Sequence, residues 1–577
     1  MMNRLYFGDN LEVLNKIDAA SVDLIYLDPP FNSKATYNIL YRSPVGADAQ
    51  RKAFEDTWRW EDGAEEALDK VRVTNLAVFK VLTSLQSFLG QSDLMAYLAM
   101  MAVRLVELHR VLKPTGSLYL HCDPTASHYL KVILDGVFGP DAFKTEISWR
   151  RQSAHNDAAQ GRKQYGNVRD TIFFYTKSSK WTWNWLYTPY DEAYVAKFSR
   201  HIEEGSGRRY FLGDITAPGG ADPAKRNPHY EFLGVTRYWR FTQERMQKMY
   251  EEGRIVQSGP GKVPRQKRYL DEMPGVALQN DWTDIKPLHG SNQERIGYPT
   301  QKPLALLERI IRASSNEGDV VLDPFCGCGT AVHAAERLGR KWIGIDITYL
   351  AIQVIEDRIK TWLPQAKYTV EGIPKDEFTA RQLAKRDPYV FQDWAVSRVG
   401  GQARGRGPDK GIDGEIAFLL GQQKKYGHAI VSVKAGQHVG PDAIRVLKSV
   451  VAREGADMGV FICLNEPTAE MRTEAATGGR IELPGGARPR IQIVTVKDLI
   501  AGPNLGILTE LNAVRAAQEA KAVQRKRKPK PPTPDQLRRE PPLPPMPIEG
   551  GRRGPTQMPI ALDEPVLVPQ TKGRRKR

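Results

Sequence analysis

The chain has 577 residues, of which 41% are hydrophobic and 26% charged, and its net charge is +16. At roughly 100–200 residues per domain, this length predicts three or four globular domains. No stretch approaches the roughly 18 consecutive apolar residues of a membrane span, and the first residues lack the apolar core of a secretory signal. The four cysteines are too few and scattered for a disulfide framework. We therefore expect a cytoplasmic protein without a membrane partner, and its charge favours a polyanion such as nucleic acid.

Two regions are typical of buried strands in a parallel sheet. The first is SVDLIYLDPPF at 21–31, an apolar run that ends in a rigid Pro-Pro turn. The second is DVVLDPFCGCGT at 319–330, which a helical stretch and the strand KWIGIDI at 341–347 follow. This second set has the length of one right-handed βαβ unit. Between the two regions, the pattern predicts a helix over 94–112 that leads into a strand at 117–123.

The remaining chain divides by composition. Regular α/β alternation is lost between about 150 and 280, where aromatic and basic residues are frequent, and a new α/β segment runs from 375 to about 500. Residues 521–577 hold 13 of the 39 prolines, no aromatic residue and ten of the 16 net positive charges. Such a tail cannot bury enough apolar surface to offset its ordering entropy, so we expect disorder there. Its role would be nonspecific attraction to nucleic acid, or solvation alone.

The motif DPFCGCGT has the features of a cofactor-binding turn. Asp323 ends a strand, Gly327 and Gly329 permit a tight turn with close approach of a ligand, and a helix begins near Thr330. Asp346 ends the next strand, where a carboxylate can accept hydrogen bonds from both hydroxyls of a ribose. Glycine turns also serve packing alone, but the two acids favour a nucleoside-containing cofactor. The dinucleotide fingerprint GxGxxG is absent, so NAD fits poorly.

The motif DPPF at 28–31 predicts the chemistry of an amine. Pro29 and Pro30 remove backbone N–H groups, so the wall beside Asp28 offers acceptors only. An exocyclic amine could donate one hydrogen to the Asp28 carboxylate and one to the Pro29 carbonyl, while Phe31 stacks on the base. The alternative is a structural Pro-Pro loop with an Asp that faces solvent.

Together, DPPF and DPFCGCGT resemble the amino-methyltransferases of DNA, which transfer methyl from S-adenosylmethionine to adenine N6 or cytosine N4. The order of the motifs resembles the permuted β class, with a target recognition domain between them. GDNLEVL at 8–14, WTDI at 282–285 and YPTQKPLALLERII at 298–311 match as well. This resemblance implies a catalytic set of Asp28, Pro29, Pro30 and Phe31, without a metal. It implies a cofactor-binding set of Asp9, Lys302, Pro303, Asp323, Phe325, Gly327, Gly329, Thr330 and Asp346.

The implied mechanism starts from double-stranded DNA, whose target base must be flipped out to reach a buried carboxylate. Direct transfer then needs no covalent enzyme intermediate. Asp at the first motif position with Phe at the last favours adenine, with cytosine N4 as the alternative. RNA presents the same amine and stays open as a substrate. Candidates for reading the sequence are Arg150, Arg151, Arg209, Arg237 and Arg240, with Gln160 and Asn184 as further options.

The segment 375–500 resembles the Mrr-like branch of the PD-(D/E)xK nucleases. In that family an Asp and a second acid or Gln, two residues before a Lys, hold Mg²⁺. Asp413 and Lys434 match, but Ser432 stands where the second metal ligand is expected, and a hydroxyl binds Mg²⁺ poorly. Glu415 could compensate. The alternative is an inactive nuclease-like fold that binds DNA.

The predicted fold class is α/β: a permuted Rossmann-like methyltransferase sheet with an inserted recognition domain, then a smaller restriction-endonuclease-like domain. The predicted domains are 1–150 and 281–370 for the methyltransferase, 151–280 for target recognition, 375–505 for the nuclease-like domain and 521–577 for the tail. Adenine-N6 methylation of DNA is the predicted function. The alternatives are cytosine-N4 methylation, a methylase–nuclease fusion, or a noncatalytic DNA-binding protein. A homodimer and association with the nucleoid are further expectations.

Overall fold

A computed structural model describes residues 2–507 apart from several gaps. The gaps are 31–35, 43–47, 56–59, 61, 153–162, 164, 199–200, 219, 221–225, 289–291, 293, 297, 299, 404–410, 421–425, 437–438 and 484–485. The tail at 521–577 lies outside the described residues, so its expected disorder stays a prediction. Within the described part of the chain, no helix is both long and apolar enough to cross a bilayer.

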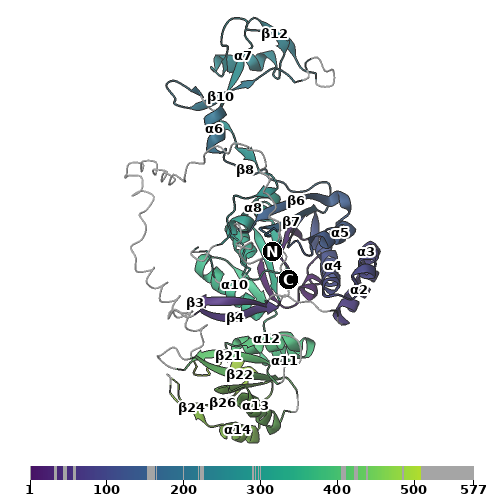
Figure 1. The fold of residues 1–577 in the computed structure, drawn as a ribbon, viewed down its shortest axis with the longest axis vertical. Helices are drawn as coiled ribbons and strands as arrows, with labels where there is room; N and C mark the ends of the chain where they lie inside the picture. Colours follow the sequence, from purple (N-terminus) through teal and green to yellow (C-terminus); the bar gives the residue numbers. More distant parts are fainter. Residues whose placement is uncertain are drawn as a thin grey trace, which may run out of the picture. The chain divides into compact units, whose positions relative to one another are not determined.

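A mixed sheet organises the N-terminal part of the chain (Figure 1), and its described strands number nine. They are ordered β16 (Asp281–Trp282), β6 (Phe143–Arg150), β7 (Arg169–Thr176), β5 (Leu112–Cys122), β2 (Val22–Leu27), β17 (Val320–Asp323), β18 (Lys341–Asp346), β1 (Asn3–Phe7) and β19 (Tyr368–Glu371). β7 is antiparallel to both neighbours, and the other neighbouring pairs are parallel. The large α/β sheet expected from the sequence is confirmed.

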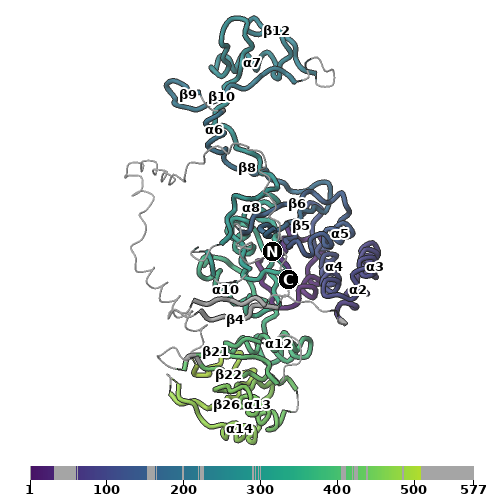
Figure 2. The backbone as a smooth tube through the Cα atoms, in the orientation of Figure 1, coloured from purple at the N-terminus to yellow at the C-terminus, as the bar shows by residue number. Residues whose placement is uncertain are grey.

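The two motif-bearing strands lie side by side at the centre of this sheet. Leu24 and Ile25 of β2 are in register with Val321 and Leu322 of β17. Figure 2 shows the purple-to-blue N-terminal segments and the teal-green segments labelled α8 and α10 within the same body. Because both strands are parallel, their carboxyl ends meet at one edge of the sheet, which is where ligands bind in open α/β sheets.

Side chains of β2 alternate between the two faces of the sheet, as a strand period of two requires. Leu24 and Tyr26 belong to the core under one helical layer, whereas Ile25 and Leu27 belong to the core under the other. The first layer is α8 (Leu304–Ser314), α9 (Thr330–Arg337) and α10 (Tyr349–Trp362). The second is α1 (Asn10–Leu14), α2 (Asp62–Thr74), α3 (Leu76–Leu89), α4 (Asp93–Val111) and α5 (Ser127–Phe138).

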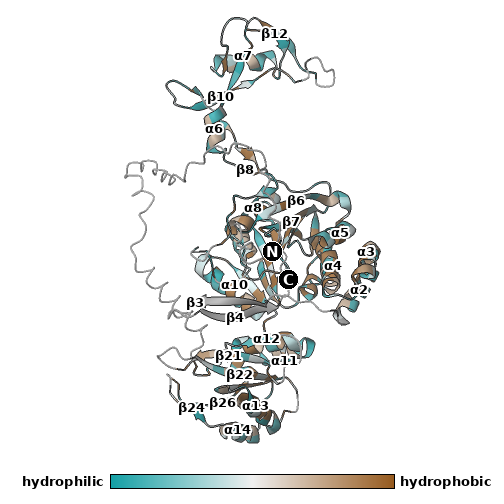
Figure 3. Ribbon diagram, viewed as in Figure 1, coloured by the Kyte–Doolittle hydropathy of each residue, from teal (hydrophilic) through white to brown (hydrophobic). Residues whose placement is uncertain are grey.

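The helix predicted over 94–112 is confirmed as α4. Ser92 caps its N-terminus, accepting a hydrogen bond from the amide of Met95 at 3.2 Å. The helix ends at Val111, three residues before Pro114, because a proline disfavours the helical conformation in the residue that precedes it. α4 is drawn mostly in hydrophobic brown in Figure 3, and Arg104 is the one charged residue among its buried side chains.

One strand of the large sheet lies where we expected the recognition domain to have begun. β7 has the buried sequence TIFFYT and pairs along its length with β5 and β6. The large sheet thus extends to Thr176, into the range predicted for the recognition domain, whose bounds stay a prediction.

The segment between β7 and β16 forms small sheets with a separate core. Its elements are β8 (Tyr187–Thr188), α6 (Glu192–Phe198), β9 (His201–Ile202), β10 (Arg209–Asp214), β11 (His229–Phe232), β12 (Val235–Tyr238), α7 (Gln243–Glu251), β13 (Ile255–Val256), β14 (Arg265–Tyr269) and β15 (Val276–Ala277). Trp239, Met246 and Phe232 lie at the centre of that core.

The C-terminal segment is a second α/β sheet with helices. Its described strands are ordered β20 (Gln402–Ala403), β21 (Gly414–Leu419), β22 (Tyr426–Lys434), β23 (Met458–Cys463) and β26 (Ile491–Thr495). Its helices are α11 (Glu377–Arg386), α12 (Pro388–Arg398), α13 (Pro441–Arg453), α14 (Ala469–Ala476) and α15 (Val496–Ala501). Two hairpins complete the description: β3 (Thr36–Arg42) with β4 (Asp48–Glu55), and β24 (Arg480–Ile481) with β25 (Arg488–Pro489).

Candidate active site

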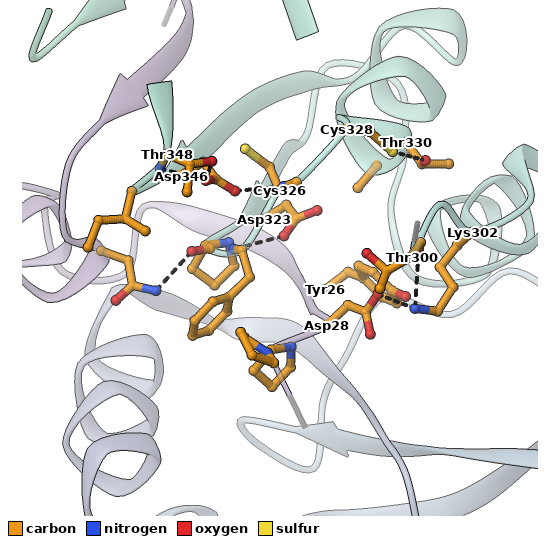
Figure 4. Close-up of a pocket in the computed structure, with 18 of the residues that line it drawn as sticks. Tyr26, Asp28, Thr300, Lys302, Asp323, Cys326, Cys328, Thr330, Asp346 and Thr348 are labelled. Carbon is orange, nitrogen blue, oxygen red and sulfur yellow. Dashed lines mark hydrogen bonds and ion pairs between the residues drawn. The ribbon is translucent and has the colours of Figure 1, made fainter. Parts of the chain in front are cut away.

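Four acidic residues meet at the carboxyl edge of the large sheet. Asp9, Asp346, Asp323 and Asp28 end or follow β1, β18, β17 and β2, which are consecutive neighbours in the sheet. All four line one cavity (Figure 4). Of the residues predicted for the site, those that line it are Asp9, Asp28, Pro29, Pro30, Lys302, Asp323, Phe325, Gly327, Thr330 and Asp346. Phe31 lies outside the described residues, so its stacking role stays a prediction.

Asp28 is held by a lysine that the sequence had associated with the cofactor. The Lys302 ammonium donates to the Asp28 carboxylate and lies 3.5 Å from the carbonyl oxygen of Thr300. Figure 4 shows this pair at one end of the cavity, whose lining also includes Pro29 and Pro30. Pro303 does not line the cavity; it is buried where α8 begins.

The turn after β17 and the end of β18 are joined by hydrogen bonds. The Gly327 amide donates to one oxygen of Asp346 at 2.9 Å, and the Thr348 amide and hydroxyl donate to the other at 2.9 and 2.8 Å. Burial raises the pKa of Asp346 to about 6, although these donors oppose the change. The carboxylate is therefore oriented by the chain at the cavity wall, and the oxygen that accepts only from Gly327 retains a lone pair for a hydroxyl ligand.

The two glycines of the turn have different roles. Gly329 has φ +73° and precedes α9, and a Cβ there would lie 2.8 Å from Cγ1 of Ile355. Gly327 has φ +49° and borders the cavity, and a Cβ there would come no closer than 3.5 Å to Tyr298. Gly329 thus allows close packing against α10, while Gly327 keeps the backbone open toward a ligand. The prediction that Asp323 ends a strand and that a helix begins at Thr330 is confirmed.

Asp323 lies between the other acids and is almost completely buried. It accepts a hydrogen bond from the Phe325 amide at 3.1 Å. Burial raises its pKa well above the ordinary value, and the nearby carboxylates of Asp28 and Asp346 add to the rise. The cavity therefore has a low-dielectric floor with closely spaced acids, an arrangement common at functional sites.

A buried arginine braces the loop that carries Asp9, and sequence reasoning missed it. Arg104 of α4 donates to Asp9 at 2.8 Å, to the side-chain oxygen of Asn10 at 2.5 Å and to the carbonyl of Met100 at 3.0 Å. Asn10 in turn donates to the carbonyl of Pro324 at 2.9 Å. The available signal was a single arginine within the apolar stretch LMAYLAMMAVRLVEL. Asp9 is thus positioned by the protein and also caps α1 through the amide of Leu11.

A second missed feature is a buried polar chain behind the cavity. It consists of Tyr26, His121 and Asp170, with Arg151 at its far end. Tyr26 also lines the cavity. The available signal was a single histidine, His121, within the apolar strand sequence SLYLHC.

The predicted readers of DNA sequence have different surroundings. Arg150, Arg209 and Arg237 are exposed. Arg151 is paired with Asp170 at 3.1 Å, and the Asn184 side chain donates to the carbonyls of Arg312 and Ser315 at the C-terminal end of α8, so these two serve the fold. The Arg240 guanidinium, although exposed, donates to the carbonyl of Thr216 at 2.9 Å. Gln160 lies outside the described residues.

The acidic residues of the C-terminal domain are engaged by the domain itself. One oxygen of the buried Asp413 accepts from the Val433 amide at 2.7 Å and from the Ser432 hydroxyl at 3.3 Å, and Lys434 lies 3.6 Å from it. Glu415, expected to compensate for Ser432, is instead 3.3 Å from His428. Across the described ranges, no group of three or more His, Cys, Asp or Glu side chains could hold a metal ion.

Comparison with known families gives two matches. Residues 22–357 match the family of DNA methylases acting at N6 and N4 amines. Residues 391–501 match a family described as NACHT-associated inactive Restriction Endonuclease 1. The nuclease-related character of the C-terminal segment thus has support, whereas its predicted assignment to the Mrr-like branch does not.

Curated relatives include the Type II methyltransferase M.EcaI of Enterobacter cloacae. It is 29% identical over 403 residues, which cover 68% of this chain and 78% of M.EcaI. The DNA adenine methyltransferase YhdJ of Escherichia coli K12 is 27% identical over 343 residues, 59% of this chain and 76% of YhdJ. The StyLTI Mod subunit of Salmonella typhimurium, a Type III restriction-modification enzyme, is 26% identical over 59% of this chain and 50% of its own length.

Among solved structures, TTHA0409 of Thermus thermophilus in complex with S-adenosyl-L-methionine has 17% identity and a TM-score of 0.31. The match covers 65% of this chain and all of that one. The cytosine-N4-specific PvuII DNA methyltransferase has 14% identity and a TM-score of 0.31, and the match covers 68% of this chain and 94% of that one.

Proposed function

The chain belongs to the N6/N4 DNA methylase family, and from this premise we propose that it transfers methyl from S-adenosylmethionine to adenine N6 of a base flipped out of duplex DNA. The observation that carries the proposal is the convergence of Asp28, its Pro-Pro wall and the turn at Gly327 on one cavity. Relatives whose names specify Type II methylation and adenine methylation support the reaction class.

The cofactor side of the cavity fits a nucleoside. Asp346 would accept from the ribose hydroxyls, and Asp9, braced by Arg104, would approach the adenine ring. Gly327 leaves the backbone open on this side. When bound, S-adenosylmethionine supplies a methyl group on a positively charged sulfur, which leaves without help from a metal.

The base side of the cavity fits an amine. Asp28 would accept one amine hydrogen and the Pro29 carbonyl the other, which directs the nitrogen lone pair toward the methyl group. The incoming amine must share Asp28 with Lys302, because the ammonium already donates to that carboxylate. Lys302 therefore fixes the orientation of the Asp28 carboxylate before the base arrives.

Two experiments test the assignment. Asp28→Ala should abolish methyl transfer and leave cofactor binding by calorimetry nearly unchanged; full activity of the variant would refute the proposal. Methylation-sensitive single-molecule sequencing of DNA from cells expressing the protein reports the modified base and its sequence context together. We expect to find N6-methyladenine. Finding N4-methylcytosine instead would show that cytosine, and not adenine, is the target base.

For the C-terminal domain we propose a noncleaving role in DNA binding. The partners of Asp413 and Glu415 described above, and the family's description as inactive, support this over a methylase–nuclease fusion. Unmethylated DNA incubated with Mg²⁺ and either the protein or its Lys434→Ala variant should stay intact in both cases. Cleavage that depends on Lys434 would establish the fusion instead. The expected homodimer stays a prediction, which sedimentation velocity would test.

A further inference from the structure

A hydrogen-bonded chain runs from the cavity wall into the protein interior. The hydroxyl of Tyr26 on β2 lies 3.0 Å from Nδ1 of His121 on β5, and Nε2 of His121 lies 3.0 Å from a carboxylate oxygen of Asp170 on β7. All three side chains are at most 3% exposed. Arg151 is 3.1 Å from the other oxygen of Asp170.

The charge state of Asp170 gives this chain a direction. Burial alone would raise the pKa of Asp170, but the hydrogen bond from His121 and the positive charges of Lys302 and Arg151 lower it below the ordinary value. Asp170 is therefore an ionised acceptor, so Nε2 of His121 carries a hydrogen. Nδ1 of the neutral imidazole is then an acceptor for the Tyr26 hydroxyl, whose pKa is raised by burial and by Asp28.

Tyr26 and Asp28 are neighbours on the same side of the sheet. They are two residues apart at the end of β2, a spacing that places side chains on one face, and both line the cavity. Figure 4 draws Tyr26 at the end of the cavity that holds Asp28 and Lys302. Asp28 already accepts from the Lys302 ammonium, so a proton that it takes from the amine must leave again before the pair can re-form.

We propose that Tyr26, His121 and Asp170 form a proton relay that receives the amine proton from Asp28 during methyl transfer. This inference rests on the proposed function, and it adds where the proton that the target amine loses is finally bound. Tyr26 is the member at the cavity, His121 is the final acceptor, and Asp170 is a positioning residue that orients the imidazole and stabilises its cation.

Atoms and electrons balance in this reaction. The amine nitrogen forms a bond to the methyl carbon as the carbon–sulfur bond breaks, and sulfur keeps that electron pair. One N–H bond then breaks, leaving its pair on nitrogen, and the proton passes to Asp28. Asp28 then transfers a proton to the Tyr26 oxygen, while the hydroxyl proton of Tyr26 moves to Nδ1 of His121. Tyr26 ends neutral, Asp28 ends ionised, and an imidazolium remains beside the Asp170 carboxylate.

The test is single-turnover methylation by the full-length chain across a range of pH. The substrate is DNA amplified in vitro, which carries no methyl groups. The variants are Tyr26→Phe, His121→Asn and their combination, with Tyr119→Phe as the matched control. Tyr119 is the register partner of Tyr26 on β5 and is similarly buried, but its hydroxyl bonds to Ser314 at 2.7 Å.

We expect Tyr26→Phe to lower the rate constant on the order of 100-fold, within the range of general acid–base catalysis. Because an imidazole that already carries both protons cannot accept another, the relay predicts a wild-type rate that falls at acidic pH, and Tyr26→Phe should lose this dependence. Ionisable groups that face His121 include Tyr26 from β2, Asp170 from β7 and, beyond Asp170, Arg151 after β6. The double variant should be no slower than either single variant, because one chain is broken in each.

Two results would overturn the relay. The first is a Tyr26→Phe variant with the wild-type rate constant and pH profile. The second is a double variant whose loss in rate constant equals the product of the two single losses while the pH dependence is retained. The cofactor affinity and the unfolding temperature of each variant show whether it is folded. If one of the variants does not fold, Asp170→Asn takes its place. If Asp28→Ala is inactive while Tyr26→Phe is fully active, the relay alone fails. If Asp28→Ala is active, the proposed function itself fails.

Discussion

The two α/β segments of this chain both place acidic residues in or beside strands, but they use them differently. In the methyltransferase segment, four carboxylates from neighbouring parallel strands face a shared cavity. In the C-terminal segment, Asp413 accepts from the next strand's amide and lies beside Lys434, and Glu415 faces His428. An acid in or beside a strand is thus a candidate ligand-binding group only where the fold leaves space beside it.

The largest expected difference between the two segments is in methylation. Asp28→Asn removes the ionised acceptor for the amine and should lower the methylation rate by on the order of 10³-fold, as for loss of a preorganised polar group in other enzymes. Asp413→Asn should leave that rate unchanged. Single-turnover assays on both variants test the comparison, and equal losses would contradict it.

The next effect concerns the glycine turn. Gly329→Ala should destabilise the methyltransferase segment by about 2–5 kcal/mol, since a left-handed residue and a clash with Ile355 add together. The control is Gly318→Ala, at φ +84° with nothing within 4 Å of the added methyl, for which about 1–2 kcal/mol is expected. Urea unfolding measures both, and Ile355→Ala should relieve part of the Gly329→Ala loss. Equal costs for the two glycines would show that packing against α10 is unimportant.

A smaller effect is the pH dependence of cofactor binding. Burial raises the pKa of Asp346 to about 6, so the carboxyl group gains a proton as pH falls through that value and loses acceptor capacity. The dissociation constant for S-adenosylmethionine should therefore rise below pH 6, by at most about tenfold per pH unit. Calorimetry from about pH 5 to 8 measures this. Asp346→Asn should bind S-adenosylmethionine more weakly than the wild type at the alkaline end of this range, and its dissociation constant should not depend on pH. If the variant keeps the pH dependence of the wild type, Asp346 is not the group responsible.

The smallest effect is expected in the C-terminal segment. Lys434 is 44% exposed, so its pair with Asp413 is partly screened by solvent. Lys434→Ala should change the free energy of unfolding by about 0–1 kcal/mol. A loss of several kcal/mol in urea unfolding would show that Asp413 depends on this lysine as a buried partner.

Local features of the site could be predicted from the sequence, because they depend on the backbone nearby. The apolar runs before Asp28 and Asp323 form strands, and Gly329 has the left-handed φ that a tight turn into a helix needs. The helix over 94–112 was likewise evident from its apolar pattern. β7 could not be identified in this way, since no regular alternation precedes it and its place depends on pairing with β5.

The sequence by itself determined the family, the positions of the acids at strand ends and the glycine turn. Only the tertiary structure decided which group each acid meets. Lys302 reaches Asp28 across 274 residues of chain, Arg104 reaches Asp9 across 95, and His121 reaches Asp170 across 49. The physical reason is that strand order and helix packing bring these partners together, and a buried charge is stable only beside the partner that the fold supplies.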